Sequence, residues 1–99
     1  MLAEREPSPV VELNLAVAVA MAFGPAQGLA LVDPLREEPA LAGYHLLSAV
    51  RGDMLEKLGR LPEARAEFER AAALTRNARE REVLLARAAG CHGQGAVRR

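Results

Sequence analysis

The sequence has few aromatic residues: they make up 3% of its 99 residues, and tryptophan is absent. Apolar residues still account for 51% of the chain, and many of them are alanines. β-Branched residues are scarce outside residues 10–19, which disfavours strands. Small apolar side chains suit thin, closely packed helices, and a chain of this length forms one domain with a modest core. The composition therefore predicts a single all-α domain.

The chain also lacks the features of secreted and membrane proteins. Its single cysteine, Cys91, has no partner for an internal disulfide bond, so a reducing compartment is the simplest interpretation. The first residues are charged and short, unlike a signal peptide. The longest apolar run, residues 15–23, is about half of the roughly 20 residues that a membrane-spanning helix needs. We therefore expect a cytoplasmic protein without a membrane segment.

Residues 44–77 carry the clearest helical pattern. Apolar residues at spacings of three and four predict a helix from about Ala42 to Leu58, and Gly59 is its expected stop. Pro62 suits the first turn of a second helix, which is expected to reach Thr75. The apolar face of the first helix consists of Leu47, Val50, Met54, Leu55 and Leu58, and that of the second of Ala64, Phe68, Ala71, Ala72 and Leu74.

The N-terminal third predicts two further helices. Ser8 is a candidate N-cap for a helix over residues 9–23, and Gly24 begins a turn into a helix that ends at about Val32. The first of these helices is apolar almost all round, so we expect other elements to cover it on several sides. Pro34 disfavours helix at the residue before it, and residues 35–42 are expected to be a loop with about one helical turn.

The C-terminal part predicts a closing helix. Asn77 is a candidate stop for the helix before it, and residues 78–89 are expected to be helical, with Val83, Leu84 and Ala88 facing the stack. Gly90 to Arg99 offers three glycines and no apolar face, so it is expected to be disordered. The predicted organisation is a lead-in over residues 1–8, a helical domain over residues 9–89 and a tail over residues 90–99.

Residues 44–77 resemble a tetratricopeptide repeat, a helical hairpin of about 34 residues. The family's pattern of three small residues, an aromatic residue and a small residue is matched by Gly52, Gly59, Ala64, Phe68 and Ala71. Ser48 stands where the repeat usually has Trp, and Arg76 where it usually has Pro. Since Gly24 and Gly59 are 35 residues apart, residues 9–32 look like another such hairpin. The expected fold is tetratricopeptide-like helical hairpins, two repeats plus a closing helix.

A more specific resemblance covers about Ser8 to Leu84. The segments that carry it are residues 11–14 (VELN), 16–24, 43–45 and 51–53. They are similar to the C-terminal, tetratricopeptide-like extension of a large actinobacterial group of extracytoplasmic-function RNA polymerase sigma factors. Two positions depart from that family: Leu15 replaces the usual Arg, and Pro34 interrupts a helix that normally continues.

That resemblance implies a regulatory or protein-binding tail. Its expected partners are the sigma regions or RNA polymerase. The sigma regions, which bind the polymerase and read promoter DNA, are not found in this sequence, and nothing in it resembles a basic recognition helix. We therefore expect regulation of transcription through protein contacts, with no direct contact between this chain and nucleic acid. The alternative is a free-standing adaptor that binds a peptide or forms a homodimer.

Residues with reactive side chains are present, but their settings do not favour catalysis. Cys91 and His92 are neighbours in a glycine-rich segment, which does not hold a fixed geometry, and a zinc site needs four ligands. His45, near the start of a helix, is more suited to packing or capping. Glu37 and Glu38 form a solvated charge run on a loop. We expect no catalytic residues, no cofactor and no metal, and the protein is not expected to be an enzyme.

Asn14, Arg51 and Asp53 are the candidate partner-binding residues. In tetratricopeptide-like folds the first helix of each hairpin lines a groove, and polar side chains there hold a peptide or a neighbouring domain. Asn14 can both donate to and accept from a peptide backbone. A structural role is the alternative for each residue: Asn14 then bridges internal backbone groups, and Arg51 and Asp53 pair with each other or with Glu12.

Overall fold

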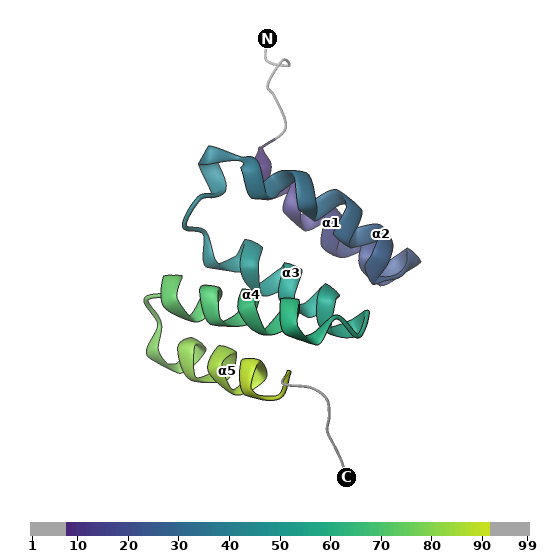
Figure 1. The fold of residues 1–99 in the computed structure, drawn as a ribbon. Helices are drawn as coiled ribbons and strands as arrows, with labels where there is room; N and C mark the ends of the chain where they lie inside the picture. Colours follow the sequence, from purple (N-terminus) through teal and green to yellow (C-terminus); the bar gives the residue numbers. More distant parts are fainter. Residues whose placement is uncertain (1–7, 92–99) are drawn as a thin grey trace.

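The computed structural model describes residues 8–91, which form α-helices and short 3-10 helices without a strand (Figure 1). The α-helices are α1 (Pro9–Phe23), α2 (Pro25–Val32), α3 (His45–Lys57), α4 (Leu61–Leu74) and α5 (Ala78–Ala89). The 3-10 helices η2 (Asp33–Glu37) and η3 (Pro39–Leu41) connect α2 to α3. The predicted all-α fold class is therefore confirmed. Within residues 8–91, no helix combines the length and the apolar character that crossing a bilayer requires.

Consecutive helices pack into a stack. α1 pairs with α2, α3 pairs with α4, and α5 covers the remaining side of α4 (Figure 1). α2 also packs against α3 and thereby joins the two hairpins. The largest fully buried side chains belong to Phe68, Leu55, Val32 and Cys91, which come from four different parts of the chain. The core is thus continuous along the stack rather than divided between hairpins.

Most helix ends lie close to the predicted ones because capping residues mark them, but α3 begins at His45, three residues after the predicted Ala42. The hydroxyl of Ser8 accepts a hydrogen bond from the Val10 amide at 3.1 Å, as expected for the N-cap of α1. Asn77 acts at the start of α5: its side-chain oxygen accepts from the Glu80 amide at 2.9 Å. The loop predicted over residues 35–42 is more regular than expected, since it holds most of η2 and all of η3.

A tight turn joins α3 to α4. The Arg60 amide donates to the Leu55 carbonyl at 2.9 Å, and the Gly59 amide donates to the Glu56 carbonyl at 3.0 Å. Gly59 has a φ of 80°, a left-handed conformation that glycine adopts without the steric cost of a Cβ atom. This pair of hydrogen bonds is the Schellman arrangement, and it satisfies carbonyl groups that the end of α3 would otherwise leave unpaired.

The expectation that α1 is covered on several sides was wrong. The structure buries only Leu13 and Ala16 of this helix. Val11 and Leu15 are each 57% exposed, and Met21 is 84% exposed. The reason is position: α1 lies at the end of the stack, packs mainly on α2 and touches α3 only slightly (Figure 1). An all-round apolar composition does not reveal that only one side has a neighbour.

The packed domain extends beyond the predicted boundary at residue 89. Gly90 and Cys91 follow α5 directly, and the Cys91 amide donates to the Ala88 carbonyl at 3.0 Å. Cys91 is 1% exposed and belongs to the core. The rest of the predicted tail, including His92, and the predicted lead-in up to Pro7 lie outside the described residues.

α3 and α4 approach closely where Gly52 faces Phe68. A Cβ atom added to Gly52 would lie 2.9–3.2 Å from three carbons of the Phe68 ring, which is fully buried. The guanidinium carbon of Arg87, from α5, lies 4.5 Å from the centre of the same ring. This arrangement is a cation–π contact. One aromatic ring therefore joins α3, α4 and α5.

Replacing Gly52 with alanine is expected to lower the free energy of unfolding by about 1–3 kcal/mol, because the new methyl group overpacks the Phe68 ring. The better helix propensity of alanine offsets at most about 1 kcal/mol of that cost. Urea unfolding followed by circular dichroism measures the change. Gly90→Ala is the matched control, since its nearest contact would be an ordinary 3.5 Å and its φ of −74° suits alanine. Equal stability of the two variants would contradict the close approach.

Candidate protein-interaction site

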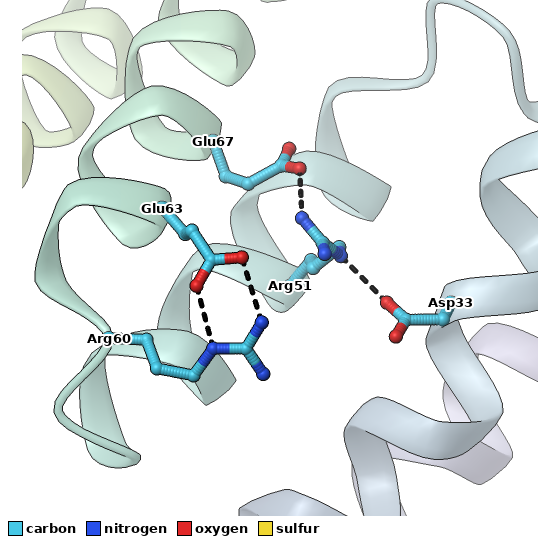
Figure 2. Close-up of polar contacts among 5 residues, drawn as sticks. All are labelled: Asp33, Arg51, Arg60, Glu63 and Glu67. Atoms are coloured by element: carbon cyan, nitrogen blue, oxygen red, sulfur yellow. Dashed lines mark hydrogen bonds and ion pairs between the residues drawn. The ribbon is translucent and has the colours of Figure 1, made fainter.

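Arg51 is buried between the two hairpins (Figure 2). From α3, its Nε donates to Oδ1 of Asp33 at 2.8 Å, and its Nη1 donates to Oε2 of Glu67 at 2.5 Å. Asp33 begins η2, directly after α2, and Glu67 lies on α4. Arg51 therefore bridges the end of the first hairpin to the second helix of the second hairpin.

The surroundings of Arg51 keep it charged. Burial by itself lowers the pKa of Arg51, but the hydrogen bonds and negative charges of Asp33 and Glu67 outweigh that effect and raise the pKa above its ordinary value. The Arg51 side chain is only 9% exposed, whereas those of Glu67 and Asp33 are 13% and 45% exposed. The Arg51–Glu67 pair is therefore largely desolvated, whereas Asp33 is about half exposed, and removing the cation leaves the buried Glu67 without its partner.

Asp53 belongs to a second charge cluster, which joins α3 to α5. Its carboxylate accepts hydrogen bonds from Lys57 at 2.5 Å and from Arg87 at 2.9 Å. Arg87 also donates to Glu56. Burial alone raises the pKa of Asp53, but the bonds and charges of Lys57 and Arg87 outweigh it and lower the pKa below its ordinary value.

Arg51 and Asp53 do not pair with each other or with Glu12 in the part of the chain that the structure describes. Residues two apart on an α-helix point in different directions, so one side chain turns toward α4 and η2 while the other turns toward α5. The structure thus places two of the three candidate residues in separate clusters between helices. Both residues therefore hold neighbouring helices together.

Asn14 lies on a surface that we name the outer α1 face. This face consists of Val11, Asn14, Leu15, Ala18, Met21 and Ala22, all of which are exposed. They recur at spacings of three and four, on the side of α1 opposite the buried Leu13 and Ala16. Within residues 8–91, the Asn14 side chain has no hydrogen-bond partner, so its amide does not bridge internal backbone groups there. Asn14 is the one polar side chain on this face.

His45 and Cys91 also take part in contacts between helices. His45 Nε2 lies 3.0 Å from Oε1 of Glu80, which accepts a hydrogen bond from the Thr75 hydroxyl at 2.7 Å. The bond from Thr75, followed by the contact with His45, lowers the pKa of Glu80.

Burial, together with the charge of Glu56 3.7 Å from the sulfur, raises the pKa of Cys91 and keeps the thiol protonated. Among residues 8–91, no three His, Cys, Asp or Glu side chains are grouped as a metal site.

A comparison with known proteins finds a similarity over part of the chain. An uncharacterized protein of Rhizobium meliloti (strain 1021) is 52% identical to this chain over 75 residues. The match covers 76% of this chain but only 17% of the relative, so the shared segment is a small part of that protein. No protein-family profile matches the sequence. No solved structure matches it either.

Replacing Arg51 with glutamine is expected to cost about 3 kcal/mol of unfolding free energy, because Glu67, which is only 13% exposed, loses its cation in a desolvated setting. Arg60→Gln is the matched control. Arg60 also forms hydrogen bonds of 2.7 and 2.8 Å, with Glu63 (Figure 2), but both of these side chains are about half exposed, so a loss below about 1 kcal/mol is expected. Both variants remove one positive charge. If urea unfolding gives the same loss of unfolding free energy for both variants, burial of the Arg51 bridge does not increase its contribution to stability.

The stabilising effect of Asp53 is expected to depend on pH. Since folding lowers the pKa of Asp53, its contribution is complete above the unfolded-state value of about 3.9 and is lost as the pH falls through the lowered folded-state value. The urea midpoint of the wild type should therefore exceed that of Asp53→Asn most clearly at pH 6. The difference should narrow below about pH 4. A difference that is unchanged or larger at pH 3 would contradict the assigned sign.

Proposed function

We propose that this chain is a C-terminal regulatory domain of an extracytoplasmic-function RNA polymerase sigma factor, and that it acts through protein contacts. In this proposal it neither binds promoter DNA nor catalyses a reaction. The observation that carries the proposal is the outer α1 face, which is apolar and has no neighbour among residues 8–91. The partners that we propose for this face are the sigma regions of the same protein.

The outer α1 face has the properties of a surface that another protein covers. Met21 at 84% exposure and Leu15 at 57% exposure lie on one continuous helix side rather than as isolated apolar residues. Contiguous apolar patches of this kind mark protein contacts in soluble proteins. Glu12 is the one charged residue of α1, so the helix offers little for the phosphates of nucleic acid. Asn14 adds a single polar group that can fix the orientation of a partner.

The resemblance of residues 8–84 to the sigma-factor extension supports the identity of the partner. The arrangement of two hairpins and one further helix, with the small Gly52 against the large Phe68, is also what tetratricopeptide-like repeats require. In the uncharacterized Rhizobium protein, the similar segment covers 17% of the length, so it lies within a larger protein. That setting suits a domain that docks on its neighbours. In this proposal Asn14 contacts the partner, while Arg51 and Asp53 hold the helices that present it.

A free-standing adaptor that forms a homodimer is the second candidate. Val11, Leu15, Ala18 and Ala22 follow each other at intervals of four, three and four, which is the spacing of a helix pairing seam. Because the seam carries no charge, two copies of α1 can meet without like-charge repulsion. This candidate uses the same residues as the first but predicts a different partner.

The test is a binding measurement between the purified domain and sigma regions two and four of the sigma factor it accompanies. Leu15→Ser and Asn14→Ala are expected to weaken capture, by about tenfold or more for Leu15→Ser, because each removes a contact from the outer α1 face. Leu85→Ser is the matched control: Leu85 is a 47% exposed leucine on α5, at the other end of the stack. Analytical ultracentrifugation of the domain alone gives its oligomeric state.

Capture that weakens in Leu15→Ser but not in Leu85→Ser supports the regulatory domain. Absence of capture together with a dimer that Leu15→Ser dissociates would overturn it in favour of the adaptor. Absence of capture with a monomeric domain would overturn both functions of the outer α1 face.

A further inference from the structure

A hollow of about 230 Å³ lies away from the outer α1 face, between the η2–η3 connection, the first turns of α3 and the last turns of α4. In Figure 1, α3 begins and α4 ends on the left side of the stack, at its middle level. Arg36, Tyr44, Leu47, Arg51, Arg70 and Leu74 are among its lining residues. Pockets for small-molecule ligands usually measure about 300–1,000 Å³. The hollow is smaller than those, so it suits a side chain or two of a peptide.

Arg51 supplies unused hydrogen-bond donors at this hollow. It is 7% exposed, and its bonds to Asp33 and Glu67 use Nε and Nη1 (Figure 2). Nη2 forms no hydrogen bond within residues 8–91. A guanidinium has five N–H donors, so the bridge between the hairpins leaves capacity for a further acceptor. The unused N–H groups of this buried guanidinium can bind an acceptor from a ligand, and a carboxylate matches the geometry of a guanidinium best.

Arg36 and Arg70 add two further cations. Both side chains are exposed, and neither forms a hydrogen bond or an ion pair with another described residue. Glu37 and Glu67 also line the hollow, but Glu67 is already bonded to Arg51. Since the charge of Arg51 is already matched by Glu67 and Asp33, the remaining charged residues of the lining are two cations, Arg36 and Arg70, and one anion, Glu37. The charge of the lining favours an anionic ligand over a cationic one.

The remaining lining is apolar or lies at a helix start. Leu41, Leu47 and Leu74 form a small apolar wall in a lining that is otherwise mostly polar. α3 begins at the same place, since its N-cap is Tyr44, and no side chain caps this helix. The uncapped amides of a helix start favour a negative charge nearby. The hollow thus combines anion-binding groups with a place for an aliphatic side chain.

We propose that this hollow is a binding site for an acidic peptide segment in which a carboxylate side chain is followed by a leucine-like residue. The carboxylate takes the free N–H groups of Arg51, with Arg36 and Arg70 beside it. The aliphatic side chain lies against the apolar wall. The site does not depend on the outer α1 face or on its partner, because the two surfaces use different helices and share no residue.

The test uses a blocked hexapeptide of alanines with a central glutamate–leucine pair, and the same peptide with glutamine in place of glutamate. Each is titrated into the ¹⁵N-labelled domain and followed by NMR at the arginine Nε–H signals. The glutamate peptide is expected to shift the Arg51 signal and to bind at least about tenfold more tightly than the glutamine peptide, because only a carboxylate forms charge-assisted bonds. Sodium acetate is titrated as the small-anion comparison.

The double variant Arg36→Gln/Arg70→Gln is expected to weaken peptide binding about tenfold or more while preserving the fold, because both side chains are exposed. Arg76→Gln/Arg79→Gln removes the same charge from exposed arginines that do not line the hollow, and should leave binding unchanged. If both double variants weaken peptide binding equally, the loss of binding comes from the net charge of the domain, and this result would overturn the site. Equal binding of the two peptides, or acetate binding as tight as that of the glutamate peptide, would overturn it too. Leu15→Ser should not change the binding of the glutamate peptide. Failure of the peptide site is therefore distinguishable from failure of the contact with the sigma regions.

Discussion

The contact between Gly52 and the Phe68 ring determines how closely α3 and α4 pack. A hydrogen atom in place of a side chain lets the fully buried ring lie directly against the α3 backbone. The ring is also where α5 is fixed, because Arg87 lies over it and reaches back to Asp53 on α3. In a chain whose described core is mostly leucine and alanine, one ring provides the large shape that aligns three helices.

α3 is tied to its neighbours by charges of opposite sign on different sides. Arg51 is the cation that two carboxylates share on the side of η2 and α4, and Asp53 is an anion shared by two cations near α5. Such clusters contribute less to net stability than apolar packing of the same volume, because desolvation offsets much of their attraction. Their geometric demands are stricter, however, and they favour one rotation of α3 about its axis. The same rotation brings Arg51 to the hollow beside η2 and η3.

The sequence predicted the helices well and their surroundings poorly, for a physical reason. Helix ends depend on local signals, so Ser8, Gly24 and Gly59 were sufficient to place α1, α2 and the end of α3 nearly as observed. The contact of Gly52 with Phe68 was also foreseeable, since a known repeat pattern pairs a small with an aromatic residue at these positions.

Contacts across the stack were not foreseeable in the same way. The two ion partners of Arg51, and Arg87 as a partner of Asp53, lie 16 to 34 residues away, and local spacing does not choose among the many charged residues at such distances. Periodicity also fails for α1, which is apolar all round and gives no sign of which side remains exposed. Cys91 was assigned to a glycine-rich tail, although its small apolar side chain is well suited to close the end of the core.

The two ends of the stack are unlike, and this gives the domain a polarity. α5 is amphipathic, with several charged residues on its exposed surface, among them Arg79, Arg81 and Glu82, so it terminates the helical array much as a capping repeat does. α1 ends the array with an apolar surface, which water does not favour. Any helix that extends this array therefore gains more by joining next to α1 than next to α5. Between its two ends, the α1 end is therefore the favoured one for adding a further helix.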